Sequence, residues 1–465
     1  MANHVAELEG IRVPPQAIDV EQAVLAAMLL DKEAVSTAIE TIDETYFYKE
    51  SHRKIYLAIV DLYDRHEAVD MLTITEELKK KGDIEDVGGP YYISEIVNSV
   101  PSSANVEYHI KIVKQKALSR KLITVCNEIV TGAYQQEKDV GDLLDQAEQS
   151  IFKISEDRIK KGFESVNPIL HSTFERIDEL YHSSGTGITG IGAGFKKLDE
   201  FTAGFQKADF VVLAGRPSMG KTAFALNLMR NAAVDNGIPV GFFSLEMSAE
   251  ALVLRLLCTE SRVNQMAVRT GKMNAEEMKR LSKYVGVLDQ APIYIDDTPG
   301  LNVLQLRSKA RRLVADKNVK MFIVDYLQLM EGSREESRQQ EITKISRSLK
   351  GLAKELDMPV IALSQLSRAV ETRDKSRKPQ LSDLRESGAI EQDADVVLFV
   401  YRPEYYDIQT FEDTGESTIN KSEIIIGKQR NGPVGTIRLT FLKEYGKFAD
   451  PAPFVEESVY PTDDF

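Results

Sequence analysis

A lysine and a threonine stand directly after the second of two glycines in the middle of the chain, in the stretch GRPSMGKTAF. The spacing is G-x-x-x-x-G-K-[ST], formed by Gly215, Gly220, Lys221 and Thr222. A turn of this kind aims several backbone N–H groups at a phosphate, and the helix that follows adds its positive N-terminal end. The lysine can reach the β- and γ-phosphates of a nucleotide, and the threonine hydroxyl suits a bound Mg²⁺. The pattern therefore predicts a nucleotide site.

Three further polar residues follow apolar runs that are typical of β-strands. Glu246 ends VGFFSLE, Asp325 ends MFIVD, and Gln365 ends VIALSQ. Ligands of open α/β sheets bind beyond the carboxyl ends of the strands, so we expect these side chains to meet the glycine-rich turn. Asp325 fits the acid that holds Mg²⁺ together with Thr222, and Glu246 fits the carboxylate that activates water. Gln365 could bind the γ-phosphate.

Each of these roles has an ordinary structural alternative. Glu246 could cap the helix that follows it, and Gln365 could be a polar loop residue without a role. Both alternatives remain open at the level of the sequence.

Two basic segments follow. The stretch from Leu366 to Gln380 carries five basic against two acidic residues, a local net charge of +3, and no aromatic residue. A mobile loop of this kind suits contacts with a nucleic-acid backbone better than base stacking, although a solvated charged loop would look the same. Farther on, Lys428 and Arg430 flank Gln429 just before an Asn-Gly turn. A cation on such a hairpin could act as an arginine finger, which stabilises charge as a γ-phosphate departs.

The elements that must position these residues fall into two classes. Periodic apolar segments without strand signals predict helices over the first part of the chain, and Asn105–Gln135 reads as one long helix or a hairpin of two. After Phe195, apolar strands alternate with helices, which predicts a mostly parallel sheet covered on both faces, and the last two strands form a hairpin. We therefore expect a flexible N-terminus (1–16), a helical domain (17–135), a linker with a helix (136–191), an α/β ATPase domain (192–455) and an acidic tail (456–465).

Composition narrows the remaining classes. The chain has 465 residues, a net charge of −14, and 43 % hydrophobic and 28 % charged residues. No apolar run approaches the ~18 residues that cross a bilayer, and the start resembles no export signal, so we expect a cytoplasmic protein without a membrane partner. Cys126 and Cys258 are expected to be buried free thiols. An acidic protein can still bind nucleic acid if its cations line one groove.

With these residues in place, the chain resembles the DnaB family of bacterial replicative DNA helicases from about Pro14 to Phe454. The segments that carry the resemblance are PPQAIDVEQAVLAAML, VPSSANVEYHIKIV, GFKKLDEFTAGFQKADFVVLAGRPSMGKTAFALN, SLEMS, IVDYLQLM, SQLSRAVE, LSDLRESGAIEQDAD and KQRNGPVG. The resemblance implies a RecA-like P-loop NTPase domain and an all-α N-terminal collar. It also implies a homohexameric ring that hydrolyses ATP with Mg²⁺ and moves 5′ to 3′ along single-stranded DNA. Primase and a helicase loader are the implied partners.

The resemblance also assigns roles residue by residue. Glu246, Asp325 and Gln365 keep the roles given above, and the LRESG motif outranks the more basic stretch before it as the DNA-backbone loop. The further assignments are Ser218 and Ala223 in the phosphate loop, Arg255 near the nucleotide, Arg385, Glu386 and Gly388 on DNA, and Lys428, Gln429 and Arg430 in the hairpin that acts on a neighbouring subunit.

Two other functions compete with a helicase. A RecA-like strand-exchange or repair ATPase would share the core and the DNA loops but lack the helical collar. A nucleotide-switched scaffold or clock-like ATPase would need no basic central loop. Strand displacement on a forked duplex separates the helicase from both.

Overall fold

The computed structural model describes residues 13–100, 102–135, 139–141, 143, 146–147, 150–151, 154, 166–182, 187–330, 338–373 and 377–451. The chain forms two compact units, Met1–Glu175 and Arg176–Phe465. The predicted acidic tail (456–465) lies outside the described residues, as do most of the predicted flexible N-terminus (1–16) and much of the linker (136–191). No helix within the described ranges is long and apolar enough to span a membrane.

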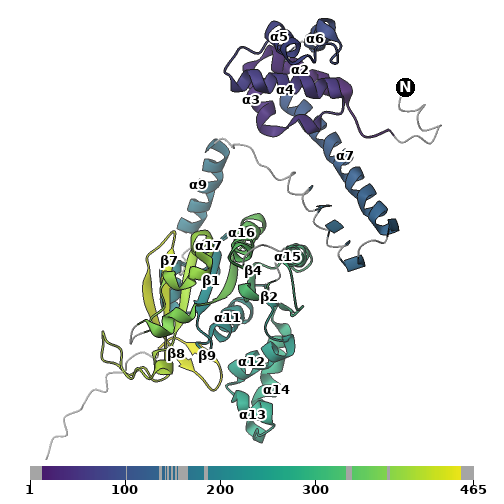
Figure 1. The fold of residues 1–465 in the computed structure, drawn as a ribbon. Helices are drawn as coiled ribbons and strands as arrows, with labels where there is room; N and C mark the ends of the chain where they lie inside the picture. Colours follow the sequence, from purple (N-terminus) through teal and green to yellow (C-terminus); the bar gives the residue numbers. More distant parts are fainter. Residues whose placement is uncertain are drawn as a thin grey trace, which may run out of the picture. The chain divides into compact units, whose positions relative to one another are not determined.

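The first unit is all-helical, as the periodic apolar pattern predicts (Figure 1). Its centre is α2, whose residues from Ala23 to Leu29 are all buried, because helices pack around it on every side. Local signals fix the ends of the surrounding helices. For example, Asp70 caps α5 by accepting from the N–H groups of Leu72 and Thr73, and Gly82 ends it with φ +77°. The elements are α2 (Ile18–Leu30), α3 (Lys32–Thr41), η1 (Glu44–Tyr46), α4 (Glu50–Asp64), α5 (Met71–Lys81), α6 (Gly89–Val97) and α7 (Val106–Gln135).

Helix α7 resolves the alternative that the sequence left open, because Val106–Gln135 is one continuous helix. Only its first turns are buried, through Val106, Ile110 and Val113, so the rest of the helix is largely exposed. Cys126 lies on that exposed part, and the expectation of two buried thiols is therefore wrong for Cys126 and correct for Cys258.

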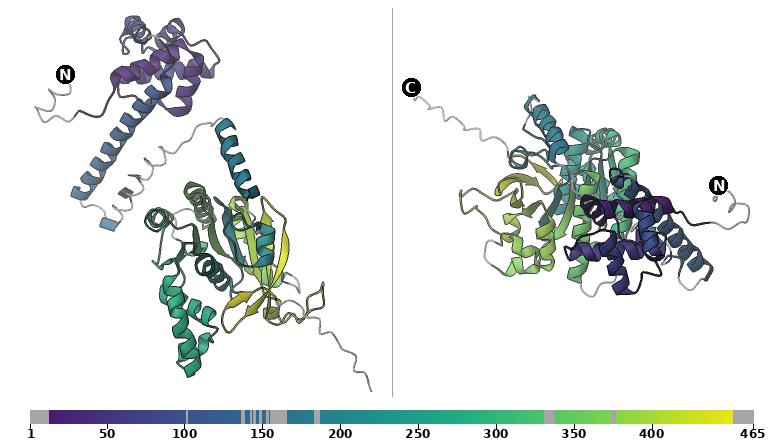
Figure 2. Two further views of the ribbon diagram at one scale, coloured as in Figure 1. Left: turned by 180° about the vertical axis from the view of Figure 1, so that it is seen from behind. Right: turned by 90° about the horizontal axis from the view of Figure 1, so that it is seen from above.

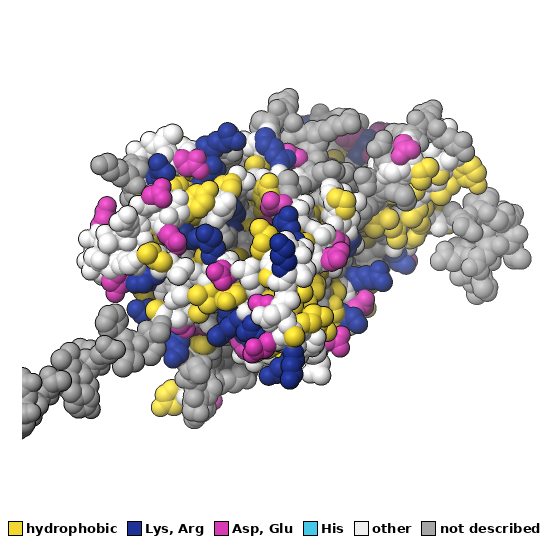
Figure 3. Space-filling model, turned by 90° about the horizontal axis from the view of Figure 1, so that it is seen from below, with side chains coloured by type: hydrophobic (Ala, Val, Ile, Leu, Met, Phe, Trp, Pro, Cys, Tyr) yellow, Lys and Arg dark blue, Asp and Glu magenta, His cyan; other side chains and the backbone are white. Residues whose placement is uncertain are grey.

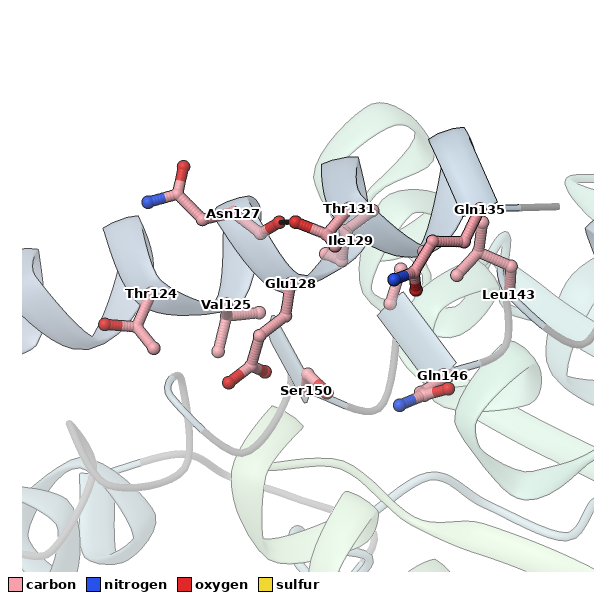
Figure 4. A pocket seen from close by; sticks show the side chains of 12 residues that line it. Thr124, Val125, Asn127, Glu128, Ile129, Thr131, Gln135, Leu143, Gln146 and Ser150 are labelled. Carbon is pink, nitrogen blue, oxygen red and sulfur yellow. Dashed lines mark hydrogen bonds between the residues drawn. The ribbon is translucent and has the colours of Figure 1, made fainter. Parts of the chain in front are cut away.

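The far end of α7 lines an open pocket of about 570 Å³ together with Leu143, Gln146 and Ser150 (Figure 4). Thr131 donates to the carbonyl of Asn127 along the helix there. Glu128 is the one ionisable side chain among the described lining residues, so this pocket holds no part of the predicted chemistry.

The second unit contains a single nine-stranded sheet in its described residues, with the order β3-β2-β4-β5-β1-β6-β7-β8-β9. The first six strands are parallel and the last three antiparallel, as predicted, except that β9 was not expected. The strands are β1 (Phe210–Gly215), β2 (Val240–Ser244), β3 (Ile293–Asp296), β4 (Met321–Asp325), β5 (Val360–Gln365), β6 (Val396–Tyr401), β7 (Lys421–Gln429), β8 (Gly435–Leu442) and β9 (Lys447–Ala449).

Helices cover both faces of this sheet (Figures 1 and 2). Because strand side chains alternate, Val211 and Leu213 of β1 enter one core, while Phe210, Val212 and Ala214 enter the other. Burial on both faces fixes β1 at the centre, and β1 leads directly into the glycine-rich turn. The first core includes α10 (Lys196–Thr202), α11 (Lys221–Arg230) and α12 (Ala249–Ser261), and the second includes α15 (Val303–Lys317), α16 (Arg338–Leu356) and α17 (Gly388–Asp393).

The remaining helices lie outside these two layers. Helices α13 (Gln265–Thr270) and α14 (Ala275–Gln290) follow α12 in the excursion between β2 and β3. Helix α9 (Val166–His182) precedes the sheet in the chain. Its apolar positions Leu170, Phe174, Ile177 and Tyr181 are all exposed.

Candidate nucleotide-binding site

The glycine-rich turn joins the end of β1 to the start of α11, as the motif predicts. Gly220 is the N-terminal cap of α11 with φ +96°, a backbone conformation that a side chain would strain. Ser218 also has a positive φ of 65°. Ala223 lies in the first turn of α11, so the backbone of the predicted phosphate loop leads into a helix N-terminus, the usual site for an anion.

Lys221 has an environment suited to phosphate. Its ammonium donates to the carbonyl of Gly215 at 2.8 Å and lies 3.5 Å from that of Arg216. Burial lowers the pKa of Lys221 to about 8, against the opposing effect of the Asp325 and Glu246 charges. A desolvated ammonium with carbonyl partners would gain from a phosphate, so the residues present fit a nucleoside triphosphate.

Thr222 and Asp325 meet, although 103 positions separate them. The Thr222 hydroxyl donates to Asp325 Oδ2 at 2.8 Å. Asp325 ends β4 and is 1 % exposed, and burial raises its pKa to about 6. A buried carboxylate beside a hydroxyl is a suitable oxygen pair for Mg²⁺, which retains water ligands as well.

Glu246 lies two residues beyond the end of β2, one strand away from Asp325. Strands β2 and β4 pair Ser244 with Asp325, and the N–H of Leu245 donates to the carbonyl of Asp325 at 2.7 Å. The Glu246 charge raises the pKa of Asp325, so the two carboxylates lie near one another. Its side chain is exposed and Ser248 caps α12, which makes the helix-cap alternative for Glu246 wrong.

Gln365 lies beside the phosphate loop, because β1 and β5 pair it with Gly215. The sequence did not single out Gln328, which holds this strand end in place. Its amide donates to Ser364 Oγ at 3.0 Å and to the carbonyl of Gln365 at 3.2 Å, and its Oε1 accepts from the Gln365 N–H. The available signal was its position three residues after Asp325.

Two arginines also adjoin the site. Arg255, on α12, is close enough for its charge to lower the pKa of Asp325. Arg402, which the sequence did not single out, follows β6, is 8 % exposed, and donates to the carbonyl of Ser218 at 3.3 Å. Like Glu246 and Asp325, it directly follows an apolar strand, and that position was the signal for it.

The hairpin residues do not join the site of their own chain. The N–H of Arg430 donates to the carbonyl of Asp395, whose side chain accepts from the N–H of Phe210, the first residue of β1. Arg430 is therefore at the amino end of β1, whereas the phosphate loop is at its carboxyl end. Six residues of strand separate the two by about 20 Å.

All three hairpin side chains contact their own subunit. The Arg430 guanidinium lies 3.3 Å from Asp395 and donates to the carbonyl of Gln392. Lys428 donates to the carbonyl of Glu391, and Gln429 to that of Phe201.

The segment between β5 and β6 is less open than its composition suggests. It contains η4 (Arg368–Thr372), η5 (Leu381–Ser387) and α17. Arg373 pairs with Asp383 and Lys378 with the buried Glu423, so part of the expected positive charge is neutralised within the chain.

The predicted DNA contacts lie on these short helices. Arg385 and Glu386 belong to η5, but their side chains fall outside what the structure describes, while Gly388 begins α17 and is exposed. On the face drawn in Figure 3, basic and acidic side chains are interspersed, so surface charge alone marks no path for DNA there.

The sheet order, the phosphate loop and the polar strand ends define the second unit as a RecA-like P-loop ATPase domain. The model of the DnaB-like helicase C-terminal domain matches residues 190–450, and that of the DnaB-like helicase N-terminal domain matches residues 13–115. The chain belongs to the DnaB-like helicase family, and its activity is that of a replicative DNA helicase.

Similar proteins cover almost the whole chain. The replicative DNA helicase DnaC of Bacillus subtilis is 47 % identical over 96 % of this chain and 97 % of its own, and DnaB of Geobacillus stearothermophilus is 46 % identical over 98 % and 99 %. A DnaB-like replicative helicase, solved in a study of its interactions with primase, superposes with a TM-score of 0.72, 34 % identity, and coverage of 94 % and 100 %. An ATPase domain that was solved on its own gives a TM-score of 0.58 and 40 % identity over 63 % of this chain and 100 % of its own.

Proposed function

We propose that this helicase works as a homohexameric ring that hydrolyses ATP with Mg²⁺ and moves 5′ to 3′ along single-stranded DNA in the cytoplasm. The observation that carries the proposal is the meeting of Lys221, Thr222 and Asp325 at the carboxyl ends of β1 and β4. Primase and a helicase loader are the proposed partners.

Each group at the strand ends has a part in hydrolysis. Lys221 and the N–H groups at the start of α11 would hold the phosphates, and Thr222 and Asp325 would hold the metal. The bound Mg²⁺ would neutralise charge on the phosphate oxygens. Glu246, which is exposed and not bonded to Thr222, would accept the proton of the attacking water. Gln365 would donate to the γ-phosphate from the neighbouring strand, and Arg255 would add positive charge nearby.

A second subunit would complete the site. Arg430 is about one strand length from the phosphate loop of its own chain, so we assign it, with Lys428 and Gln429, to the nucleotide of a neighbour. The exposed apolar stripe on α9, with Phe174 69 % exposed, supports assembly because an unpartnered surface of this kind favours burial in an interface.

The two units would divide the work. We propose residues 17–135 as the collar that binds primase, 136–191 as the linker, and 192–455 as the ATPase domain, in which Arg385, Glu386 and Gly388 contact the DNA backbone. The collar also favours a helicase over a RecA-like repair ATPase, which would lack it.

Fork unwinding tests the proposal. With ATP and Mg²⁺, the protein should displace a strand from a fork whose loading tail ends in a free 5′ end, and fail on the same duplex with only a 3′ tail. Lys221→Ala should lose both unwinding and ATP turnover, because the phosphate charge goes uncompensated. Strand exchange without fork unwinding would favour the repair ATPase.

A further inference from the structure

The phosphate loop has a second connection, formed by a residue that the nucleotide chemistry does not use. Arg216 directly follows β1 and is 8 % exposed. Its Nε donates to Glu371 Oε1 at 2.9 Å, its second terminal nitrogen lies 2.8 Å from the same oxygen, and its Nη1 donates to the carbonyl of Leu366 at 2.9 Å. In addition, the N–H of Leu366 donates to the carbonyl of Gly215. Arg216 therefore joins the phosphate loop to the segment that follows β5.

That segment leads to the proposed DNA contacts through a short series of bonds. Glu371 lies on η4, which Val370 anchors in the core at 1 % exposure. The N–H of Ser367, just before η4, donates to the carbonyl of Asp383 on η5, and Arg373 pairs with the Asp383 carboxylate. Arg385 and Glu386 belong to the same η5. Packed and bonded elements of this kind can carry a displacement from one site to another.

The nucleotide would act on the start of this series. Without phosphate, the Lys221 ammonium contacts the carbonyls of Gly215 and Arg216. If Lys221 turns to a β- or γ-phosphate, both carbonyls lose that cation, and the backbone that carries Arg216 has to find other partners. Arg216 cannot release Glu371 freely, because a buried guanidinium without its partner is costly.

We propose that Arg216 and Glu371 form a coupling pair that transmits nucleotide occupancy of the phosphate loop to the DNA-contacting segment. Neither side chain touches a reacting atom, so both are positioning residues. The inference rests on the proposed function, but it assigns a connection separate from Gln365, which would contact the γ-phosphate itself. Coupling between two ligands is reciprocal, so the pair should affect DNA affinity and nucleotide affinity by the same factor.

The experiment measures that factor in both directions. The dissociation constant of a fluorescent single-stranded oligonucleotide is measured with and without a non-hydrolysable ATP analogue, and that of the analogue with and without the oligonucleotide. The variants are Glu371→Gln, which removes the charge and keeps the shape, Glu371→Lys, which reverses the charge, and Glu371→Asp, which restores it. Asp357→Asn is the matched control, because it removes an exposed carboxylate that pairs with Lys207 at 3.2 Å, outside this series of contacts.

We expect the coupling factor of Glu371→Gln to fall about fivefold or more toward one, equally in both directions, and that of Glu371→Lys at least as far. Glu371→Asp should recover part of the coupling, and Asp357→Asn should match the parent. Parental coupling in both Gln and Lys variants would overturn the inference and leave the proposed function intact. Loss of nucleotide binding in the absence of DNA would also overturn it, since the pair would then belong to the nucleotide site. A parent that shows no coupling and unwinds no fork would overturn the proposed function as well.

Discussion

The separation of Arg430 from its own phosphate loop predicts that two inactive variants will restore one another. Arg430→Ala should bind ATP and hydrolyse it about 10³-fold or more slowly, as expected for a lost arginine finger. Glu246→Gln should bind ATP and lose ~10²-fold or more, as expected for a lost general base. If each site combines Glu246 of one subunit with Arg430 of the next, a ring that contains both variants has some complete sites.

The geometry sets the size of the recovery. A site is complete where an Arg430→Ala subunit, with its intact Glu246, receives Arg430 from a Glu246→Gln neighbour. With random assembly from equal amounts, about one site in four meets this condition. ATPase should therefore return to about a quarter of the parental rate, far above either variant alone. The measurement is steady-state ATP turnover after the two variants are dissociated, mixed and reassembled, with mixed rings verified by two affinity tags.

Lys221→Ala supplies the matched control, because Lys221 and Glu246 belong to the same side of the proposed interface. Lys221→Ala mixed with Arg430→Ala should recover activity, whereas Lys221→Ala mixed with Glu246→Gln should not. If tagged mixed rings form and the Arg430 and Glu246 variants stay inactive together, Arg430 acts within its own subunit or is not a finger.

The site and the domain organisation give three other predictions. Binding of a fluorescent ATP analogue with Mg²⁺ should fall about tenfold per unit below pH 6, where Asp325 becomes protonated, and again above pH 8, where Lys221 loses its proton. In Asp325→Asn the acid limb should be absent, and an unchanged acid limb would exclude Asp325 as its source. Arg385→Ala should weaken single-stranded DNA binding equally for unrelated sequences and reduce the log–log salt slope by roughly 0.7, and a loss limited to one base composition would contradict a backbone contact. Removal of residues 1–150 should leave ATP turnover largely in place and abolish primase binding in a pull-down assay. Primase retained by the truncated protein would place its site elsewhere.

The residues that the sequence identified are those whose role depends on local spacing. Gly220 and Lys221 occur in a contiguous motif, and Asp325 directly follows an apolar strand, so their places could be predicted before any fold was known. Parallel strands then bring their carboxyl ends together, and the contact between Thr222 and Asp325 follows. The alternating pattern likewise predicted every strand of the sheet except β9, whose three residues are too few to show a period.

What the sequence missed depends on partners that are distant in the chain. Arg216 reads as an ordinary member of the phosphate-loop motif until Glu371 is found 155 positions away. The charge of the segment after Leu366 was overestimated for the same reason, because Asp383 and Glu423 neutralise Arg373 and Lys378 only in the folded chain. Cys126 has apolar neighbours in sequence, yet α7 extends beyond the core at that point and exposes it.

The two arginines that follow from these contacts are held with opposite strength, and this difference fits their proposed roles. Arg430 is 48 % exposed, and its partner Asp395 also receives Lys350 and the N–H of Phe210. If Arg430 moves to a neighbouring nucleotide, Asp395 keeps an ion pair and a hydrogen bond, so the movement costs about 1 kcal/mol or less, as for other surface pairs. Arg216 is buried and its donors are committed to Glu371 and Leu366, so it moves only with the segment to which it is bonded. A residue that must reach another subunit has to be released easily, and one that transmits a displacement within its own subunit has to be held.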